Sequence, residues 1–120
     1  MPARRRADPE AGLRAVRTWQ ADPSNVDRTT LTLAVRFCLE ELSATAPGSS
    51  VELRVPPLGV TQCGQGPRHT RGTPPNVIET DARTWLALAT GELTWAAAVE
   101  GHRVRASGLR ADLSAWLPLV

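Results

Sequence analysis

The stretch VELRV, residues 51–55, is where the periodicity of the chain changes from helical to strand-like. Its three apolar residues alternate with Glu52 and Arg54, the pattern of a strand with one buried face. Helical spacing precedes it, and further short apolar runs follow it. Because helices and strands do not alternate strictly, the order predicts an α+β fold and disfavours a doubly wound parallel sheet.

Two helices are predicted before this strand. The first begins at Asp8, a good N-cap followed by a proline at the first helical position, and DPSN at residues 22–25 breaks it. The second begins near residues 27–29 and ends at a Pro-Gly pair, so that residues 8–48 are helical. The arginine cluster ahead of them indicates a flexible, solvated basic tail over residues 1–7.

Residues 51–119 are predicted to form a sheet with further helices. Strands are expected at residues 51–55, 58–63, 77–80 and 102–107. Helices are expected at residues 81–91 and 94–101, and a closing amphipathic helix carries Leu109, Leu113, Trp116 and Leu117. The whole chain, residues 1–120, is therefore predicted to be one domain, in which helices cover one face of a mainly antiparallel sheet.

Composition narrows the chemistry and the cellular setting. The net charge is +2 and all fourteen basic residues are arginine, so mechanisms that need a lysine Schiff base or a lysine general base are excluded. Cys38 and Cys63 lack a metal-ligand spacing, and two buried thiols are favoured over a disulfide. No signal-peptide core follows Met1, and no apolar run reaches the roughly twenty residues of a membrane span. These features predict a cytoplasmic protein.

Signatures of catalysis and of metal binding are lacking in the sequence. It contains neither GxSxG nor a phosphate-binding GxxxxGK[ST] motif. The two histidines, His69 and His102, have no supporting acid or cysteine cluster, so neither a metal nor another cofactor is expected. Cys63 and His69 are interpreted as a buried thiol and a loop histidine rather than a nucleophile pair. We therefore expect a protein that is not an enzyme.

The stretch GPRHTRGTPPNVIETD, residues 66–81, contains the clearest candidate polar site. Arg68, His69 and Arg71 lie between glycines and prolines, which favour turns and stiff backbone. Arginine forks bind carboxylates and phosphates, so this segment is predicted to be a polar or anion-binding loop. The alternative is that these side chains pair with acids on the protein's own surface or face water.

The sequence from Thr80 to Leu119 resembles the C-terminal half of the sterol carrier protein type two-like superfamily. The shared pattern is an acid at a helix start, a leucine-rich turn, a glycine, a short helix, a second glycine, a strand and a closing apolar segment. The matching positions are Asp81, Trp85, Leu88, Gly91, Ala97 to Val99, Gly101, Val104, Gly108 and Leu113. The loop at residues 66–81 is still more similar to the bacterial sterol carrier orthologues, a small actinobacterial group. Together these resemblances cover residues 51–119.

The resemblance implies a twisted sheet covered by helices on one face, with an apolar tunnel between them in the members that bind lipid. On that basis the protein is predicted to be a non-catalytic carrier of a hydrophobic ligand, such as a lipid, an acyl chain or a sterol-like molecule. The residues expected to line its cavity are Phe37, Trp85, Leu88, Trp95, Leu113 and Trp116. The same side chains fill their own core in the alternative reading, because large apolar side chains stabilise the fold when buried.

Two other functions stay open from the sequence. The first is a protein-interaction or accessory module that contacts its partner through Arg68, His69 and Arg71. The second is an enzyme that holds a small anionic substrate with the same three residues. Nucleic-acid binding is disfavoured, because the aromatic residues lie on apolar helix faces and are not interleaved with the arginines.

Overall fold

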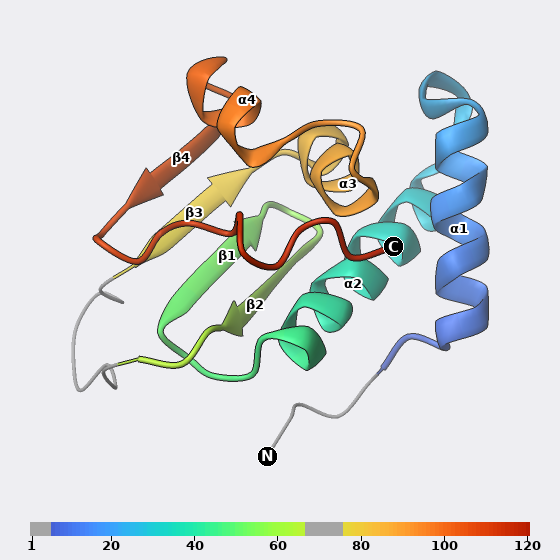
Figure 1. Ribbon diagram of the computed structural model, residues 1–120. Helices are drawn as coiled ribbons and strands as arrows, with labels where there is room; N and C mark the ends of the chain where they lie inside the picture. The colour runs from blue at the N-terminus through green and yellow to red at the C-terminus, as the bar shows by residue number, and fades with distance from the viewer. Residues whose placement is uncertain (1–5, 67–75) are drawn as a thin grey trace.

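The computed structural model describes residues 6–66 and 76–120 (Figure 1). The N-terminal part contains the helices α1 (Pro9–Ala21) and α2 (Arg28–Thr45), separated by the short 3₁₀ helix η1 (Pro23–Asn25). The strands β1 (Val51–Val55), β2 (Gly59–Cys63) and β3 (Val77–Thr80) follow. The chain continues through α3 (Ala82–Thr90), α4 (Trp95–Glu100) and β4 (Val104–Ser107).

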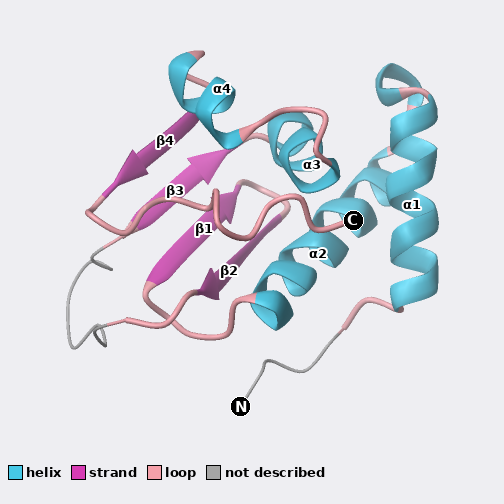
Figure 2. Cartoon of the chain, viewed as in Figure 1, coloured by secondary structure: helices cyan, strands magenta, loops and turns pink. Residues whose placement is uncertain are grey.

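The sheet has four strands in the order β2-β1-β3-β4 (Figure 2). The β1–β2 and β3–β4 pairs are antiparallel, and the central β1–β3 pair is parallel. This arrangement confirms the predicted α+β class with a mainly antiparallel sheet. It also leaves β2 as one edge strand of the sheet, and α2 packs beside it.

Only one face of the sheet is deeply buried. In β1, Leu53 is fully buried, whereas its neighbour Arg54 is partly exposed. The strand register continues this division, because Ile78 of β3 lies beside Leu53 and Glu79 lies beside Arg54. The buried face packs against the helices, as predicted, and the opposite face carries charged residues.

The helices begin where their capping residues predict. A side-chain oxygen of the N-cap residue accepts a hydrogen bond from a backbone N–H in the first turn of each of the four α-helices, which satisfies an otherwise unpaired donor. The N-cap residues are Asp8, Asp27, Asp81 and Thr94. Gly12 allows α1 to pack closely on α2, because a Cβ atom at this position would overlap the ring of Phe37.

The predicted closing helix is wrong. Residues 108–120 contain no helix and instead run as an irregular segment across the buried face of the sheet (Figure 1). The backbone N–H groups of Leu119 and Val120 donate to the carbonyl oxygen of Ala89, at 2.8 and 3.1 Å, which joins the segment to α3. Leu113, which belongs to this segment, is fully buried. The segment therefore buries its apolar residues through contacts with α3 and the sheet, without forming helical turns.

Candidate ligand-binding groove

The six residues predicted to line a cavity lie in or against the hydrophobic core. Five are at least nine-tenths buried, and Trp116 is partly buried and packs against that core. Trp85 has no solvent exposure, and its indole N–H donates to the carbonyl oxygen of Val35 at 3.3 Å. The space between the sheet and the helices is thus occupied by side chains around Trp85. The role of these residues in ligand binding stays a prediction.

The two cysteines are buried as free thiols. Burial raises the pKa of Cys38 to about 12, with the nearby charge of Glu41 adding to the effect, and burial raises the pKa of Cys63 to about 11. Because the thiolate is the reactive form, both groups are poor nucleophiles at neutral pH. Within residues 6–66 and 76–120, no group of three or more His, Cys, Asp or Glu side chains could hold a metal ion.

The predicted anion-binding loop lies outside the described residues. Arg68, His69 and Arg71 all fall between residues 66 and 76, so their role stays a prediction. The interpretation that Cys63 and His69 do not form a nucleophile pair is untested for the same reason. His102, the other histidine, is exposed and lies two residues before the start of β4, with a φ of 57°.

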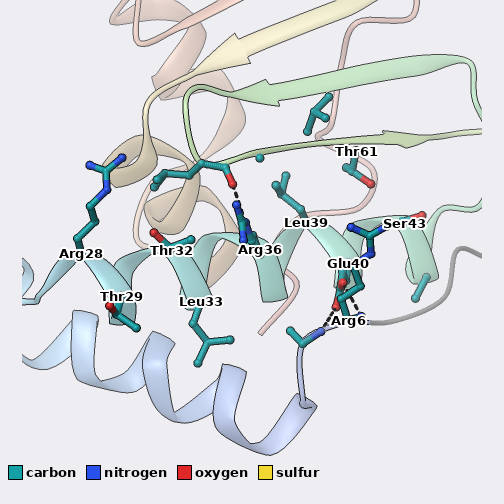
Figure 3. A pocket seen from close by; sticks show the side chains of 15 residues that line it. Arg6, Arg28, Thr29, Thr32, Leu33, Arg36, Leu39, Glu40, Ser43 and Thr61 are labelled. Atoms are coloured by element: carbon teal, nitrogen blue, oxygen red, sulfur yellow. Dashed lines mark hydrogen bonds between the residues drawn. The ribbon is translucent and has the colours of Figure 1, made fainter.

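A large groove lies between α2 and the edge strand β2, with a volume of about 1570 Å³ (Figure 3). It therefore lies between a helix and the sheet, but none of the six apolar residues predicted to line a cavity is among its described lining residues. Its lining residues come from the N-terminal segment, one side of α2 and the start of β2. They are Arg6, Ala7, Arg28, Thr29, Thr32, Leu33, Arg36, Leu39, Glu40, Ser43, Ala44, Leu58, Gly59, Val60 and Thr61.

One face of α2 supplies the polar wall of this groove. Arg28, Thr32 and Arg36 are four residues apart, which places them one above another on a helix. Figure 3 shows all three pointing from α2 toward the strands. Arg36 ties the helix to the sheet, because its Nε donates to the carbonyl oxygen of Leu58 at 2.8 Å. The wall is therefore held at a fixed distance from β2.

The apolar part of the groove comes from both α2 and β2. Val60 is 60% exposed, and the buried side chains of Leu39 and Leu58 close the floor between α2 and β2. Leu33 also lines the hollow but points away from the strands (Figure 3). Gly59 permits a close approach of helix and strand, because a Cβ atom there would lie only 2.8 Å from Leu39 Cδ1. The groove thus combines an apolar strip with a polar wall.

The charge of the groove is positive. Arg6, Arg28 and Arg36 line it, and Glu40 is the one acidic residue among the described part of its lining. The two carboxylate oxygens of Glu40 accept hydrogen bonds from the backbone N–H groups of Arg6 and Ala7, at 2.9 and 3.1 Å. Glu40 therefore anchors the segment before α1. By contrast, Arg28 makes no side-chain hydrogen bond or ion pair with any other described residue.

A second, smaller hollow of about 350 Å³ lies at the end of the sheet near β3 and β4. Several of its polar groups already have structural roles. Asp81 caps α3 through Thr84, and the Thr80 hydroxyl donates to the carbonyl oxygen of Arg103 at 2.8 Å. This hollow is therefore a weaker candidate for ligand binding than the groove along α2.

The four-stranded sheet with helices packed against one face defines an α+β protein whose fold is consistent with the sterol-carrier type. A family model described as "Bacterial SCP ortholog" matches residues 27–119, which is more than three quarters of the chain. The chain belongs to this family, as its resemblance predicted. The match includes α2 and all four strands and leaves out α1. No curated protein matches the chain. Among the described residues, no helix is long and apolar enough to cross a membrane.

Proposed function

We propose that this protein is a non-catalytic carrier that binds a hydrophobic molecule in the groove between α2 and β2, with the cytoplasm as its proposed location. The observation that carries the proposal is the groove itself, an apolar strip in a hollow of about 1570 Å³. Membership of a sterol-carrier family supports the same class of ligand. The residues first expected to line the cavity are packed in or against the core, which favours the groove over the interior as the binding site.

The dimensions of the groove suit a single hydrocarbon chain. Its lining residues on α2 run from Arg28 to Ala44, and a helical rise of 1.5 Å per residue makes this about 24 Å. Half of a bilayer's hydrocarbon core, the length covered by one acyl chain, is about 15 Å. A chain of that length would lie along the groove and leave room for a polar end.

The buried thiols support the non-catalytic part of the proposal. Cys38 and Cys63 stay protonated at neutral pH because burial raises both pKa values. Among the described lining residues there is no histidine or cysteine, and their one carboxylate, that of Glu40, accepts hydrogen bonds from two backbone amides. These described residues therefore do not provide a free general base.

Native mass spectrometry of freshly purified protein, followed by extraction of bound lipid, tests this proposal. Val60→Asp places a charge on the apolar strip, and Val99→Asp makes the same change at a 45% exposed position on α4, outside the groove. We expect the wild type and Val99→Asp to carry a hydrophobic ligand and Val60→Asp to lose it. A wild type without ligand that also fails to bind added lipids would contradict the carrier function, and equal loss in both variants would exclude the groove.

A second candidate function is that of an interaction or accessory module. The side-chain-filled interior around Trp85 supports it, as does the position of β2 at the edge of the sheet. An edge strand can pair with an extended segment of another protein. If purified protein contains no lipid and binds none, cross-linking from a photoreactive group at position 60 tests this candidate. A cross-linked protein would support a partner at β2, and no cross-link would contradict it.

A further inference from the structure

We infer that the ligand of the groove is an anionic amphiphile, with an apolar chain and a carboxylate or phosphate head held by Arg28 and Arg36. This inference rests on the proposed function and narrows it from hydrophobic molecules in general to those with a negatively charged end.

Arg28 is the group without a partner. It lies on the exposed surface of α2, lines the groove and makes no side-chain hydrogen bond or ion pair within residues 6–66 and 76–120. A guanidinium group offers several N–H donors in a planar fork that matches a carboxylate or a phosphate. The Thr32 hydroxyl lies one turn further along the same face and also has no side-chain partner among the described residues.

Arg36 completes the polar wall. Its Nε donates to the carbonyl oxygen of Leu58, which fixes the base of the guanidinium group. Its two terminal nitrogens make no hydrogen bond or ion pair with another described residue, so they can donate into the groove. Arg28 and Arg36 are eight residues apart, about 12 Å along the helix, with Thr32 between them. Their long side chains can therefore approach one anionic group above Thr32.

Glu40 does not neutralise this wall. Each of its carboxylate oxygens bonds a backbone N–H, from Arg6 and Ala7, at the end of the groove away from Arg28. The polar wall thus keeps a net positive charge next to an apolar strip. A neutral ligand would cover Arg28 without replacing its hydrogen bonds to water, which is unfavourable. An anionic head would replace those bonds with charge-assisted ones.

Four ligands with the same sixteen-carbon chain test the inference by isothermal titration calorimetry, each below its micelle concentration. They are hexadecanoate, hexadecyl phosphate, hexadecanol and hexadecyltrimethylammonium. We expect at least one of the two anions to bind about tenfold or more tightly than hexadecanol, and the cation to bind more weakly than hexadecanol. Tighter binding of hexadecanoate would identify a fatty-acid-like source, and tighter binding of hexadecyl phosphate would identify a phospholipid-like one.

Two variants with the same change in charge locate the effect. Arg28→Gln removes the unpartnered guanidinium of the groove, and Arg105→Gln removes an exposed one from β4, away from the groove. We expect Arg28→Gln to weaken anion binding about tenfold and to leave hexadecanol binding unchanged. Arg105→Gln should change neither. Added salt should weaken binding of the anions more than that of hexadecanol.

The outcomes separate the inference from the function on which it rests. If hexadecanol binds as tightly as the anions, or if Arg28→Gln has no effect on anion binding, the inference is overturned while the carrier function stands. If none of the four ligands binds, the carrier function itself is contradicted and the inference falls with it.

Discussion

The interior of the protein and the groove along α2 use side chains in opposite ways. In the interior, Trp85 and Leu113 are fully buried, and the one polar group of Trp85 has a partner within the protein. In the groove, Val60 is largely exposed and Arg28 has no partner among the described residues. Large apolar residues therefore mark the part of the chain that stabilises the fold. The surface available to a ligand comes from the polar side of a helix and from an edge strand.

Among the variants that test this comparison, Trp85→Ala is expected to lower the stability of the protein the most. Removing a buried tryptophan leaves a cavity and deletes the hydrogen bond from its indole N–H to the Val35 carbonyl, and we expect the free energy of unfolding to fall by about 3–5 kcal/mol. Urea denaturation followed by circular dichroism measures this change. Trp85→Phe is the control and should lose less, because it keeps most of the volume. A Trp85→Ala protein of unchanged stability that lost its ligand would instead make the interior the binding site.

The second prediction uses the buried thiols of the interior. The pKa values of Cys38 and Cys63 are raised in the folded protein to about 12 and about 11, so the folded state holds these protons more tightly than the unfolded state. Their contribution to stability is complete below about pH 9 and is lost as the pH rises toward 11 and 12. The slope for each thiol stays below its limit of about 1.4 kcal/mol per pH unit, because the unfolded thiols are not fully ionised at pH 9.5 and Cys63 begins to ionise in the folded protein by pH 10.5. We therefore expect a combined loss of about 2 kcal/mol between pH 9.5 and 10.5.

The composition makes this alkaline measurement unusually specific. The chain has no lysine and no tyrosine, the other side chains that ordinarily titrate near pH 10. Urea denaturation in the presence of a reductant at several pH values measures the slope. The Cys38→Ala/Cys63→Ala double variant is the control, and its stability should be lower but almost independent of pH in this range. A wild type whose stability stays constant from pH 9 to 11 would show that the thiols are not buried as described.

The sequence predicts the interior well where local signals and tertiary contacts agree. Asp8 and Asp81 are recognisable caps, and the alternation of residues 51–55 marks a buried strand face. It fails at the C-terminal segment, where Leu109 and Leu113 have helical spacing. A helix of so few residues is marginal by itself, so tertiary partners decide its conformation. Here Ala89 accepts the backbone N–H groups of residues 119 and 120, a partner that local spacing does not reveal.

The groove could be predicted only in part. Arg28, Thr32 and Arg36 share the four-residue spacing of one helix face, which is a visible signal of a polar stripe. What the sequence does not show is that β2, an edge strand, lies beside this stripe, because that depends on the order of strands in the sheet. The same spacing on a helix that faced only solvent would be an ordinary surface.

The third prediction concerns Arg36, which lines the groove and also joins α2 to the sheet. Arg36→Gln removes the hydrogen bond from Nε to the Leu58 carbonyl, which ties α2 to the sheet. We expect a loss of about 0.5–1.5 kcal/mol in the free energy of unfolding, because one net hydrogen bond is removed at a part-buried position. The exposed control Arg83→Gln on α3 should change stability by less. Equal stability of Arg36→Gln and the wild type would mean that the groove wall does not depend on this bond.

The smallest effect on stability is expected for Arg28→Gln. This variant distinguishes a role in ligand binding from a role in stabilising the fold. Arg28 is exposed and has no side-chain partner among the described residues, so its replacement should change the free energy of unfolding by no more than about 0.5 kcal/mol. Urea denaturation beside the wild type measures it. A loss above about 1 kcal/mol would mean that the guanidinium group stabilises the fold and is not free to bind a ligand. If Arg28→Gln keeps the stability of the wild type, the variant is folded. A loss of anion binding in this variant can then be attributed to the missing guanidinium group in the groove.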